Sequence, residues 1–437
     1  MALFPLLLLS ATRLRTVRQS FYLGLGLGLA IVAPQLRFFW SIFGAAAIVL
    51  WLVVAIWYAA FAATGQALHR RLAGVWTVPL IPALWMGFEF FRSELYYLRF
   101  AWITPGHALA QAGISPVYHW LGMYGVGAFL FIGPSLFWFS RHGGRWLGLA
   151  VTLIGAAALG VTETRPLAPA SAASPHRIVQ VAGAQIESMP EHHLVAVLDQ
   201  LLARYPATQL CVLPEYTLDG APGGDLMSWC RAHRQYLVVG GRELLENGRF
   251  RNTAWVIDAS GDIVFRQAKS VPIQFFNDGE AASNQAVWSS PWGALGIAIC
   301  YDLSYTRVMD RLVRQGAEAL LIPTMDSLSW GAHQHALHAR IAPIRAAEYG
   351  IPICRSASSG VSQVVDREGS ITSSAPFCEE VAFFAGSLQV DGPGRLPIDR
   401  WLAPAATVIT AGLIGWLVWP LISRQTCLGT ASPRILS

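Results

Sequence analysis

The stretch GALGIAICYDLSYTRVMDRLVRQGAEALLIPT, residues 293–324, indicates the type of fold. Its two apolar runs, 293–300 and 319–324, have the length of buried strands, and the stretch 304–315 between them is expected to be a helix. Further apolar runs lie at 177–186, 210–216, 236–241 and 252–265, and further helices are expected at 191–204, 224–234 and 333–349. Strands that alternate with helices predict a layered α/β domain with a largely buried sheet.

The 437-residue chain as a whole is too apolar for a soluble protein. Hydrophobic residues make up 54% of the sequence and charged residues 13%, and the mean hydropathy is +0.43. Segments near the length of about 20 residues that crosses a bilayer lie at 20–37, 42–65, 74–91, 118–139, 144–161 and 402–423. Residues 2–12 are too short for a regular span and are interpreted as an interfacial or re-entrant segment, with a truncated first span as the alternative. We therefore predict a polytopic α-helical membrane bundle.

Changes in composition divide the chain into four parts. Residues 1–161 form the N-terminal bundle of about five spans, and the Pro/Ala/Ser-rich segment 162–176 is a linker. The α/β domain follows at 177–391. Residues 392–437 contain a Gly/Pro-rich connection, the last transmembrane helix and a cytoplasmic tail.

Basic residues cluster in the short loops on one side of this arrangement. The clusters are Arg13, Arg15 and Arg18; His69, Arg70 and Arg71; Arg141 and Arg145; and Arg424. The positive-inside rule makes that side the cytoplasm, which places the segment 162–401 outside it. The net charge of +5 belongs mostly to arginines, many of them at helix ends, so we expect contact with anionic lipid and no nucleic-acid partner.

Three chemically reactive side chains come at or just after the ends of the expected strands. Glu215 closes the run 210–216, Cys300 closes the run 293–300, and Lys269, the only lysine among 31 Lys and Arg residues, follows the run that ends at 265. Groups at the carboxyl ends of strands tend to converge on one crevice. There, a carboxylate can take the proton of a thiol, and an ammonium can stabilise the oxyanion that forms when the thiol attacks a carbonyl group. The sequence therefore predicts a cysteine nucleophile with an acid and a lysine beside it.

The motifs around these residues resemble the nitrilase, or carbon–nitrogen hydrolase, superfamily. They are LPEY around Glu215, RQAKSVP around Lys269, ICYD around Cys300, and the later segment 344–369. The resemblance implies an α-β-β-α sandwich with Glu215 as the general base, Lys269 as the oxyanion stabiliser and Cys300 as the nucleophile. It also implies that the backbone N–H of Tyr301 is a second oxyanion donor.

Together with the membrane segments 82–111 and 119–132, the chain resembles the apolipoprotein N-acyltransferase family. This resemblance implies that an acyl chain passes from a phospholipid donor to the cysteine as a thioester, and then to the N-terminal amine of a lipoprotein. It implies a location in the bacterial cytoplasmic (inner) membrane with the catalytic domain on the periplasmic side. We expect no cofactor.

The segment KSVPIQFFNDGE (269–280) departs from the family pattern, in which the lysine is followed by two residues, a leucine and VPFGE. Asp302 takes the place of the acidic residue two positions after the cysteine, and Glu280 is the candidate for a further loop glutamate in the substrate loop. Because this loop helps to shape the acyl and acceptor pocket, the alternative function is a membrane-tethered amidase or an acyltransferase with a different acceptor.

Other features carry weaker predictions. The tract AHQHALHAR contains His333, His335 and His338, but no carboxylate or cysteine is suitably spaced beside it, so we predict no metal site. The six cysteines show no disulfide-like spacing. Five aromatic residues are candidates to line a lipid path: Trp102, Trp120, Phe275, Phe276 and Trp330.

Overall fold

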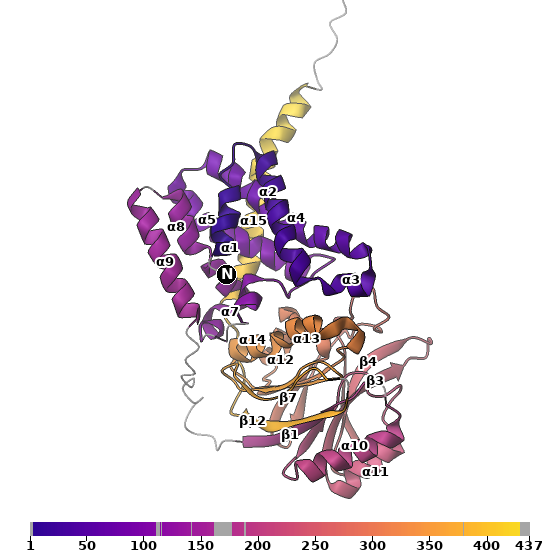
Figure 1. Ribbon diagram of the computed structural model, residues 1–437. Coiled ribbons are helices and arrows are strands. Elements are labelled where there is room, and N and C mark those ends of the chain that lie inside the picture. The colour runs from indigo at the N-terminus through magenta and orange to yellow at the C-terminus, as the bar shows by residue number, and fades with distance from the viewer. Residues whose placement is uncertain are drawn as a thin grey trace, which may run out of the picture.

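The computed structural model describes residues 3–110, 114, 116–140, 142–160, 177–187, 189–378 and 380–428. A bundle of helices lies against one side of an α/β domain, and the last helix, α15, returns from the domain into the bundle (Figure 1). The expected linker 162–176 and the end of the expected cytoplasmic tail lie outside the described residues.

Helices that precede the α/β domain, together with the last helix of the chain, form the bundle. They are α1 (Leu3–Ala11), α2 (Val17–Gln35), α3 (Phe38–Phe43), α4 (Ala46–Arg71), α5 (Gly74–Phe90) with a π-helical turn (Phe91–Leu95), α6 (Pro105–Leu109), α7 (Val117–Phe129), α8 (Ile132–Phe139), α9 (His142–Gly160) and α15 (Asp399–Leu428).

Five stretches of the described chain are long and apolar enough to cross a membrane, where the sequence predicted six spans. They are Val17–Gln35, Ala46–Arg71, Gly74–Leu95, Val117–Phe139 and Asp399–Pro420. The remaining prediction, 144–161, falls on α9, whose apolar part Gly144–Gly155 is shorter and which lies along α8. Helix α1 is too short to span, and it packs against α2, α4 and α8 with Leu8 and Leu9 fully buried.

Small residues allow α2 and α4 to approach each other closely. A Cβ atom built at Gly28 would lie 2.9 Å from the Ala55 carbonyl oxygen and 3.0 Å from Tyr58 Cβ, and one built at Gly24 would lie 2.7 Å from Ala62 Cβ. Glycines spaced four residues apart are a common contact between helices in membranes, where close packing replaces the hydrophobic effect as the driving force.

The α/β domain contains two six-stranded sheets. The first has the order β12-β1-β2-β3-β4-β5, with β1 (Arg177–Gln185), β2 (Leu210–Val212), β3 (Tyr236–Leu244), β4 (Phe250–Ile257), β5 (Ile263–Ala268) and β12 (Ala382–Val390). The second has the order β11-β10-β9-β8-β7-β6, with β6 (Val287–Ser290), β7 (Gly293–Ile297), β8 (Ala319–Thr324), β9 (Ile353–Ala357), β10 (Ser362–Val365) and β11 (Ile371–Ala375).

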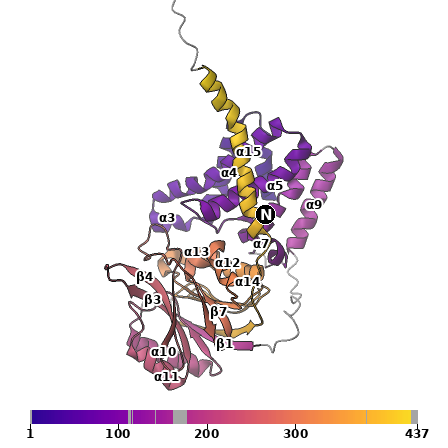
Figure 2. The same ribbon diagram turned by 180° about the vertical axis from the view of Figure 1, so that it is seen from behind.

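A helical layer covers the outer face of each sheet. Helices α10 (Glu191–Arg204) and α11 (Gly224–His233) pack on the first sheet, far from the bundle. Helices α12 (Thr306–Arg314), α13 (Gly331–Ala339) and α14 (Ile341–Tyr349) lie between the second sheet and the bundle, as Figure 2 shows from behind. The predicted α-β-β-α sandwich is confirmed, and so is the helical bundle beside it.

The structure corrects three of the predicted elements. The run 252–265 is an antiparallel hairpin, β4 and β5, because the turn 258–262 divides it. The run 210–216 pairs only as far as Val212, and Pro214, which lacks an N–H, follows it. The helix 333–349 is two helices divided at Arg340, where Pro343 denies α14 an N–H that could continue α13.

Buried charged groups dock the domain onto the bundle. The Glu348 carboxylate on α14 accepts hydrogen bonds from Arg345 at 2.5 Å and from Arg400 of α15 at 2.9 Å, and its other oxygen accepts the Met123 N–H of α7 at 2.5 Å. Arg400 also pairs with Asp310 of α12 at 2.8 Å. Because breaking a buried pair leaves an uncompensated charge, these contacts hold the domain in one orientation against α7 and α15.

We predict that Gly28→Val destabilises the bundle and that Gly26→Val, on the same helix, does not. A valine side chain in place of Gly28 would overlap α4, which typically lowers the free energy of unfolding by about 1–3 kcal/mol, whereas a Cβ at Gly26 meets nothing within 4 Å. Circular dichroism of the two variants in detergent, recorded during heating, measures the difference in their melting temperatures. Equal melting temperatures would contradict the close α2–α4 contact.

Candidate active site

Strand ends and strained turns bring the three predicted groups together. Cys300 lies just beyond β7 with φ +50°, and Tyr216, directly after Glu215, has φ +54°. A positive φ in a residue with a side chain is uncommon and persists where the surroundings fix it, often at functional sites. Lys269 follows the end of β5, and its own N–H donates to the Asn252 carbonyl of β4.

The Lys269 ammonium is held between two carboxylates. Its Nζ lies 2.7 Å from Glu215 Oε1 and 2.7 Å from Asp278 Oδ2. Lys269 is 0% exposed, Glu215 1% and Asp278 5%. The second Glu215 oxygen accepts the Met325 N–H at 2.6 Å, and the Cys300 thiol lies 3.6 Å from the Met325 carbonyl oxygen. The structure therefore assembles the acid, the lysine and the thiol predicted from the sequence.

Burial and mutual charge set the protonation of this group. Burial raises the pKa of Glu215, and Lys269 only partly opposes this shift. Burial opposes the charge of Lys269, but Glu215, Cys300 and Asp278 together raise its pKa well above its usual value. Burial, followed by Glu215, raises the pKa of the Cys300 thiol. At rest, the lysine is therefore charged and the thiol protonated, beside a carboxylate with an increased affinity for a proton.

Asp278 is the site residue that the sequence interpretation missed. Burial opposes its charge, but the Lys269 ammonium holds the pKa of Asp278 below its usual value. Its Oδ1 accepts hydrogen bonds from Tyr216 at 2.8 Å and from Asn252 at 2.9 Å, and Asn252 also donates to Glu215. The predicted loop residue Glu280 instead pairs with Arg249. The sequence feature that identifies this residue is an aspartate in the loop after the lysine, where the family pattern has a glutamate.

Asp302 positions the backbone on both sides of the site. Its carboxylate accepts the N–H groups of Ser270 and Val271, at 3.1 and 2.7 Å, and that of Ile299 at 3.2 Å. It therefore ties the segment after the lysine to the residue before the cysteine. Burial raises the pKa of Asp302 to about 6.

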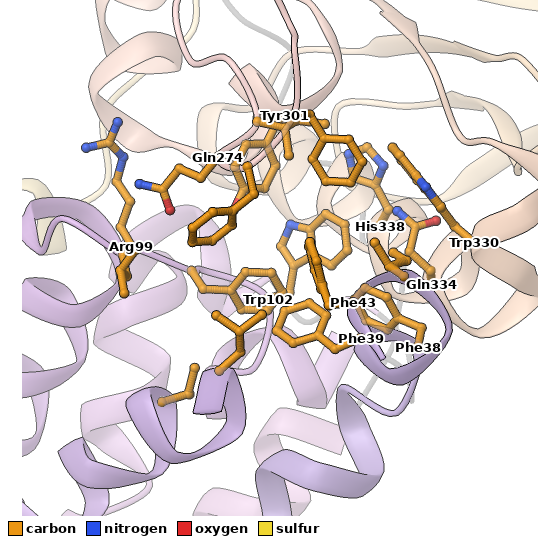
Figure 3. A pocket seen from close by; sticks show the side chains of 18 of the residues that line it. Phe38, Phe39, Phe43, Arg99, Trp102, Gln274, Tyr301, Trp330, Gln334 and His338 are labelled. Atoms are coloured by element: carbon orange, nitrogen blue, oxygen red, sulfur yellow. The ribbon is translucent and has the colours of Figure 1, made fainter. Parts of the chain in front are cut away.

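A cavity of about 830 Å³, measured together with the solvent space it opens into, lies between the bundle and the domain. Cys300 and Tyr301 are part of its wall. Figure 3 shows Tyr301 among the side chains that line it. The rest of the wall is mostly aromatic and aliphatic and includes Phe38, Phe39 and Phe43 of α3, together with Phe100, Trp102, Phe275, Phe276 and Trp330.

Four of the five predicted path aromatics line this cavity. Trp120 does not: it is 66% exposed on α7, and its ring lies against His119. The loop that follows the lysine closes over the cavity, and the rings of Phe275 and Phe276 each lie 6.0 Å from that of Phe43. The Cys300 thiol thus faces an apolar space bounded partly by membrane helices.

The histidine tract supports the wall of the cavity. His338 Nδ1 lies 2.8 Å from Asp326 Oδ1, which accepts its hydrogen bond, and the His338 ring stacks on Trp102, with the ring centroids 4.8 Å apart. His335 contacts the Ser327 carbonyl oxygen, and His333 contacts that of Gln35. In the described part of the chain, no group of three or more His, Cys, Asp and Glu side chains is placed to hold a metal ion. The five cysteines whose side chains are described are free thiols.

Both parts of the chain match known families. The family described as Carbon-nitrogen hydrolase matches residues 177–385, and the one described as Apolipoprotein N-acyltransferase N-terminal domain matches residues 1–136. The chain is 28% identical to an apolipoprotein N-acyltransferase of Rhizobium rhizogenes over 69% of its own length and 66% of that protein's. It is 25% identical to one of Brucella melitensis, over 91% and 80% of the two chains.

Solved structures resemble part of the chain at low sequence identity. A nitrilase-superfamily member of Saccharomyces cerevisiae is 20% identical with a TM-score of 0.42, covering 49% of this chain and 90% of that one. A carbon–nitrogen hydrolase of Helicobacter pylori is 18% identical with a TM-score of 0.42, covering 57% and 95%.

We predict that Asp278→Asn slows acylation of Cys300 and that Glu280→Gln does not. Besides burial, the Asp278 charge raises the pKa of Glu215. If Glu215 is the predicted general base, a neutral side chain at position 278 should make it a weaker base and lower the rate about 10- to 100-fold, which is part of what a general base contributes. The release of p-nitrophenol from p-nitrophenyl butyrate measures the rate. A larger loss in the Glu280 variant would assign the loop carboxylate to Glu280.

Proposed function

Because the chain belongs to the apolipoprotein N-acyltransferase family, we propose that it moves an acyl chain from a phospholipid to the N-terminal amine of a lipoprotein. The intermediate is a thioester on Cys300. The observation that carries this proposal is the position of the thiol, which lies in the wall of an apolar cavity between the membrane helices and the catalytic domain.

Such a cavity suits a lipid donor better than a small polar amide. An acyl chain can lie against the Phe38, Phe39 and Phe43 side chains while its ester carbonyl approaches Cys300. Cys300 is only 1% exposed, so the thioester would form away from bulk water and wait for an amine. Free access of water would favour hydrolysis, the activity of the alternative, a tethered amidase.

In the first half-reaction, Glu215 takes the thiol proton as Sγ attacks the ester carbonyl carbon. A C–S bond forms, and Lys269 Nζ and the Tyr301 N–H stabilise the oxyanion. The C–O bond then breaks, the glycerol oxygen receives the proton from Glu215, and a lysophospholipid leaves. Asp278 keeps Lys269 charged throughout.

In the second half-reaction, the α-amine of the lipoprotein attacks the thioester carbonyl carbon. Glu215 takes a proton from the amine nitrogen, the C–N bond forms, and the C–S bond breaks. The proton on Glu215 returns to the sulfur, so the enzyme regains its resting state. The same base therefore serves both steps.

The location that fits this reaction is the bacterial cytoplasmic (inner) membrane, with the domain on the periplasmic side. The support is the cluster of basic residues in loops on the opposite side, such as Arg13, Arg15 and Arg70. The domain then meets lipoproteins that have already crossed the membrane.

We predict that Cys300 gains one long acyl chain when the purified protein is incubated with phospholipid alone, and loses it when a lipopeptide with a free N-terminal amine is added. Mass spectrometry of the Cys300 peptide detects both events. Cys300→Ala should form no adduct, and Cys300→Ser very little, because a hydroxyl beside the same base is far less ionised than a thiol.

Two results would contradict this function. One is the absence of a lipid adduct in a protein that still reacts with p-nitrophenyl butyrate. The other is release of free fatty acid at the same rate with and without the amine, which would favour the amidase alternative. Restored growth of a bacterium depleted of its own N-acyltransferase would support the proposal in cells.

We predict that Lys269→Arg folds but forms the thioester about 10²–10³ times more slowly, the order of effect seen when an oxyanion donor is lost. The guanidinium is larger and planar, so its donors would be displaced from the oxyanion in a site where Lys269 is completely buried. Single-turnover acylation by phospholipid measures the rate. A rate near that of the wild type would show that only the positive charge is needed.

A further inference from the structure

Two arginines share one aromatic ring beside the active-site cavity. The Arg99 guanidinium carbon lies 5.4 Å from the centroid of the Tyr305 ring, and that of Arg307 lies 5.8 Å from the same centroid. Arg99 belongs to the loop after α5, and Arg307 to the first turn of α12. Two segments far apart in the sequence therefore bring like charges to one place.

None of the ion pairs in the described part of the chain, which join atoms within 4.0 Å, includes Arg99 or Arg307. Arg99 Nε is buried and lacks a hydrogen-bond partner there. The acidic groups that act on Arg307 are Glu94 and Asp302. Glu94 Oε1 accepts from the Tyr124 hydroxyl at 2.9 Å and from the Thr306 N–H at 3.0 Å, and Asp302 accepts backbone N–H groups of Ser270 and Val271. Burial, and then the charge of Arg99, lowers the pKa of Arg307. Like charges held together without a counter-ion point to an anionic ligand.

Arg99 lies where the donor lipid would carry its phosphate, and Arg307 lies on the same Tyr305 ring beside it. Arg99 lines the same cavity as Cys300, and Figure 3 shows it beside Gln274 at the edge of the aromatic group. The ring of Tyr305 lies 5.0 Å from that of Tyr301, the residue after the nucleophile. Arg99 also comes soon after Leu95, the end of a membrane span, which places it near the level of lipid headgroups.

We propose that Arg99, assisted by Arg307, binds the phosphodiester of the phospholipid that donates the acyl chain. This inference rests on the proposed function and identifies how its donor is recognised. In a glycerophospholipid the phosphate and both acyl esters are attached to one glycerol unit, so an ester carbonyl at Cys300 keeps the phosphate within reach of the cavity edge. Arginine suits this ligand because its planar donors match phosphate oxygens.

The test compares two acyl donors in the full-length protein. The donors are a phosphatidylglycerol in mixed micelles and p-nitrophenyl butyrate, which has no phosphate, and the readout for both is formation of the Cys300 acyl adduct. In the double variant Arg99→Gln/Arg307→Gln, we expect the half-saturating mole fraction of phospholipid to rise about tenfold or more, as lost charge-assisted hydrogen bonds would cause. The rate with the ester should stay within about twofold of the wild-type rate.

Arg311→Gln is the matched control, because Arg311 lies on the same helix but contacts the Ser283 carbonyl oxygen. The Arg311→Gln variant should form the Cys300 adduct with both donors as the wild type does. The double variant Arg99→Lys/Arg307→Lys, which keeps the charge but not the planar donors, should recover part of the affinity for phospholipid.

Three results would overturn the inference. The first is an unchanged half-saturating mole fraction of phospholipid in the glutamine variant. The second is an equal loss of the acylation rate with both donors, which would show a merely structural role. The third is a rate with p-nitrophenyl butyrate, which has no phosphate, that depends on added inorganic phosphate in the wild type but not in the glutamine variant. That result would identify a free anion as the ligand. A wild-type protein that reacts with the ester but never with phospholipid would instead refute the proposed function itself.

Discussion

A buried ammonium ion governs the arrangement of the whole catalytic domain. Lys269 is completely enclosed, and a charge removed from water in this way is tolerated only when opposite charges and hydrogen bonds surround it. Glu215, beyond β2, and Asp278, from the loop after β5, supply these charges, and Asn252 of β4 donates to both carboxylates. The ends of three strands must therefore meet at one point before the site can exist, and the ammonium ion lies where they meet.

A second constraint follows from the proposed function: the Cys300 thiol must reach a lipid acyl chain while the domain remains in water. The structure meets it by enclosing the cavity between α3, α4 and the loop after Lys269, so that Cys300 lies at the boundary of the two parts. Such a cavity keeps its shape only if the parts do not slide. The Arg345, Glu348 and Arg400 side chains, buried between α14, α7 and α15, provide this rigidity because each would be left with an unpaired charge if the parts separated.

The loop after the lysine differs in spacing from the family pattern but still brings a carboxylate to the lysine. Its sequence places Glu280 farther from Lys269 than the family pattern requires, and Glu280 pairs with Arg249 at the surface of the domain. Asp278, two residues earlier, is the carboxylate that reaches the ammonium. The extra residues include Phe275 and Phe276, which extend to α3 and Trp330 and cover the cavity. The loop therefore supplies part of the cavity wall as well as the Asp278 carboxylate beside the lysine.

The sequence by itself determined the two-part architecture and most membrane segments, and it pointed to Glu215, Lys269 and Cys300, which the structure brings together. Long apolar runs and motifs at strand ends are local signals. The sequence did not reveal strands such as β9 and β10, whose segments ICRSA and SQVV carry polar residues that find partners only inside the folded domain. Only the tertiary structure decided that Asp278 holds the lysine, that α3 closes the cavity, and that Arg99 and Arg307 meet at Tyr305. Each of these depends on distances between segments far apart in the chain or on the path of a loop, and neither residue type nor spacing specifies such distances.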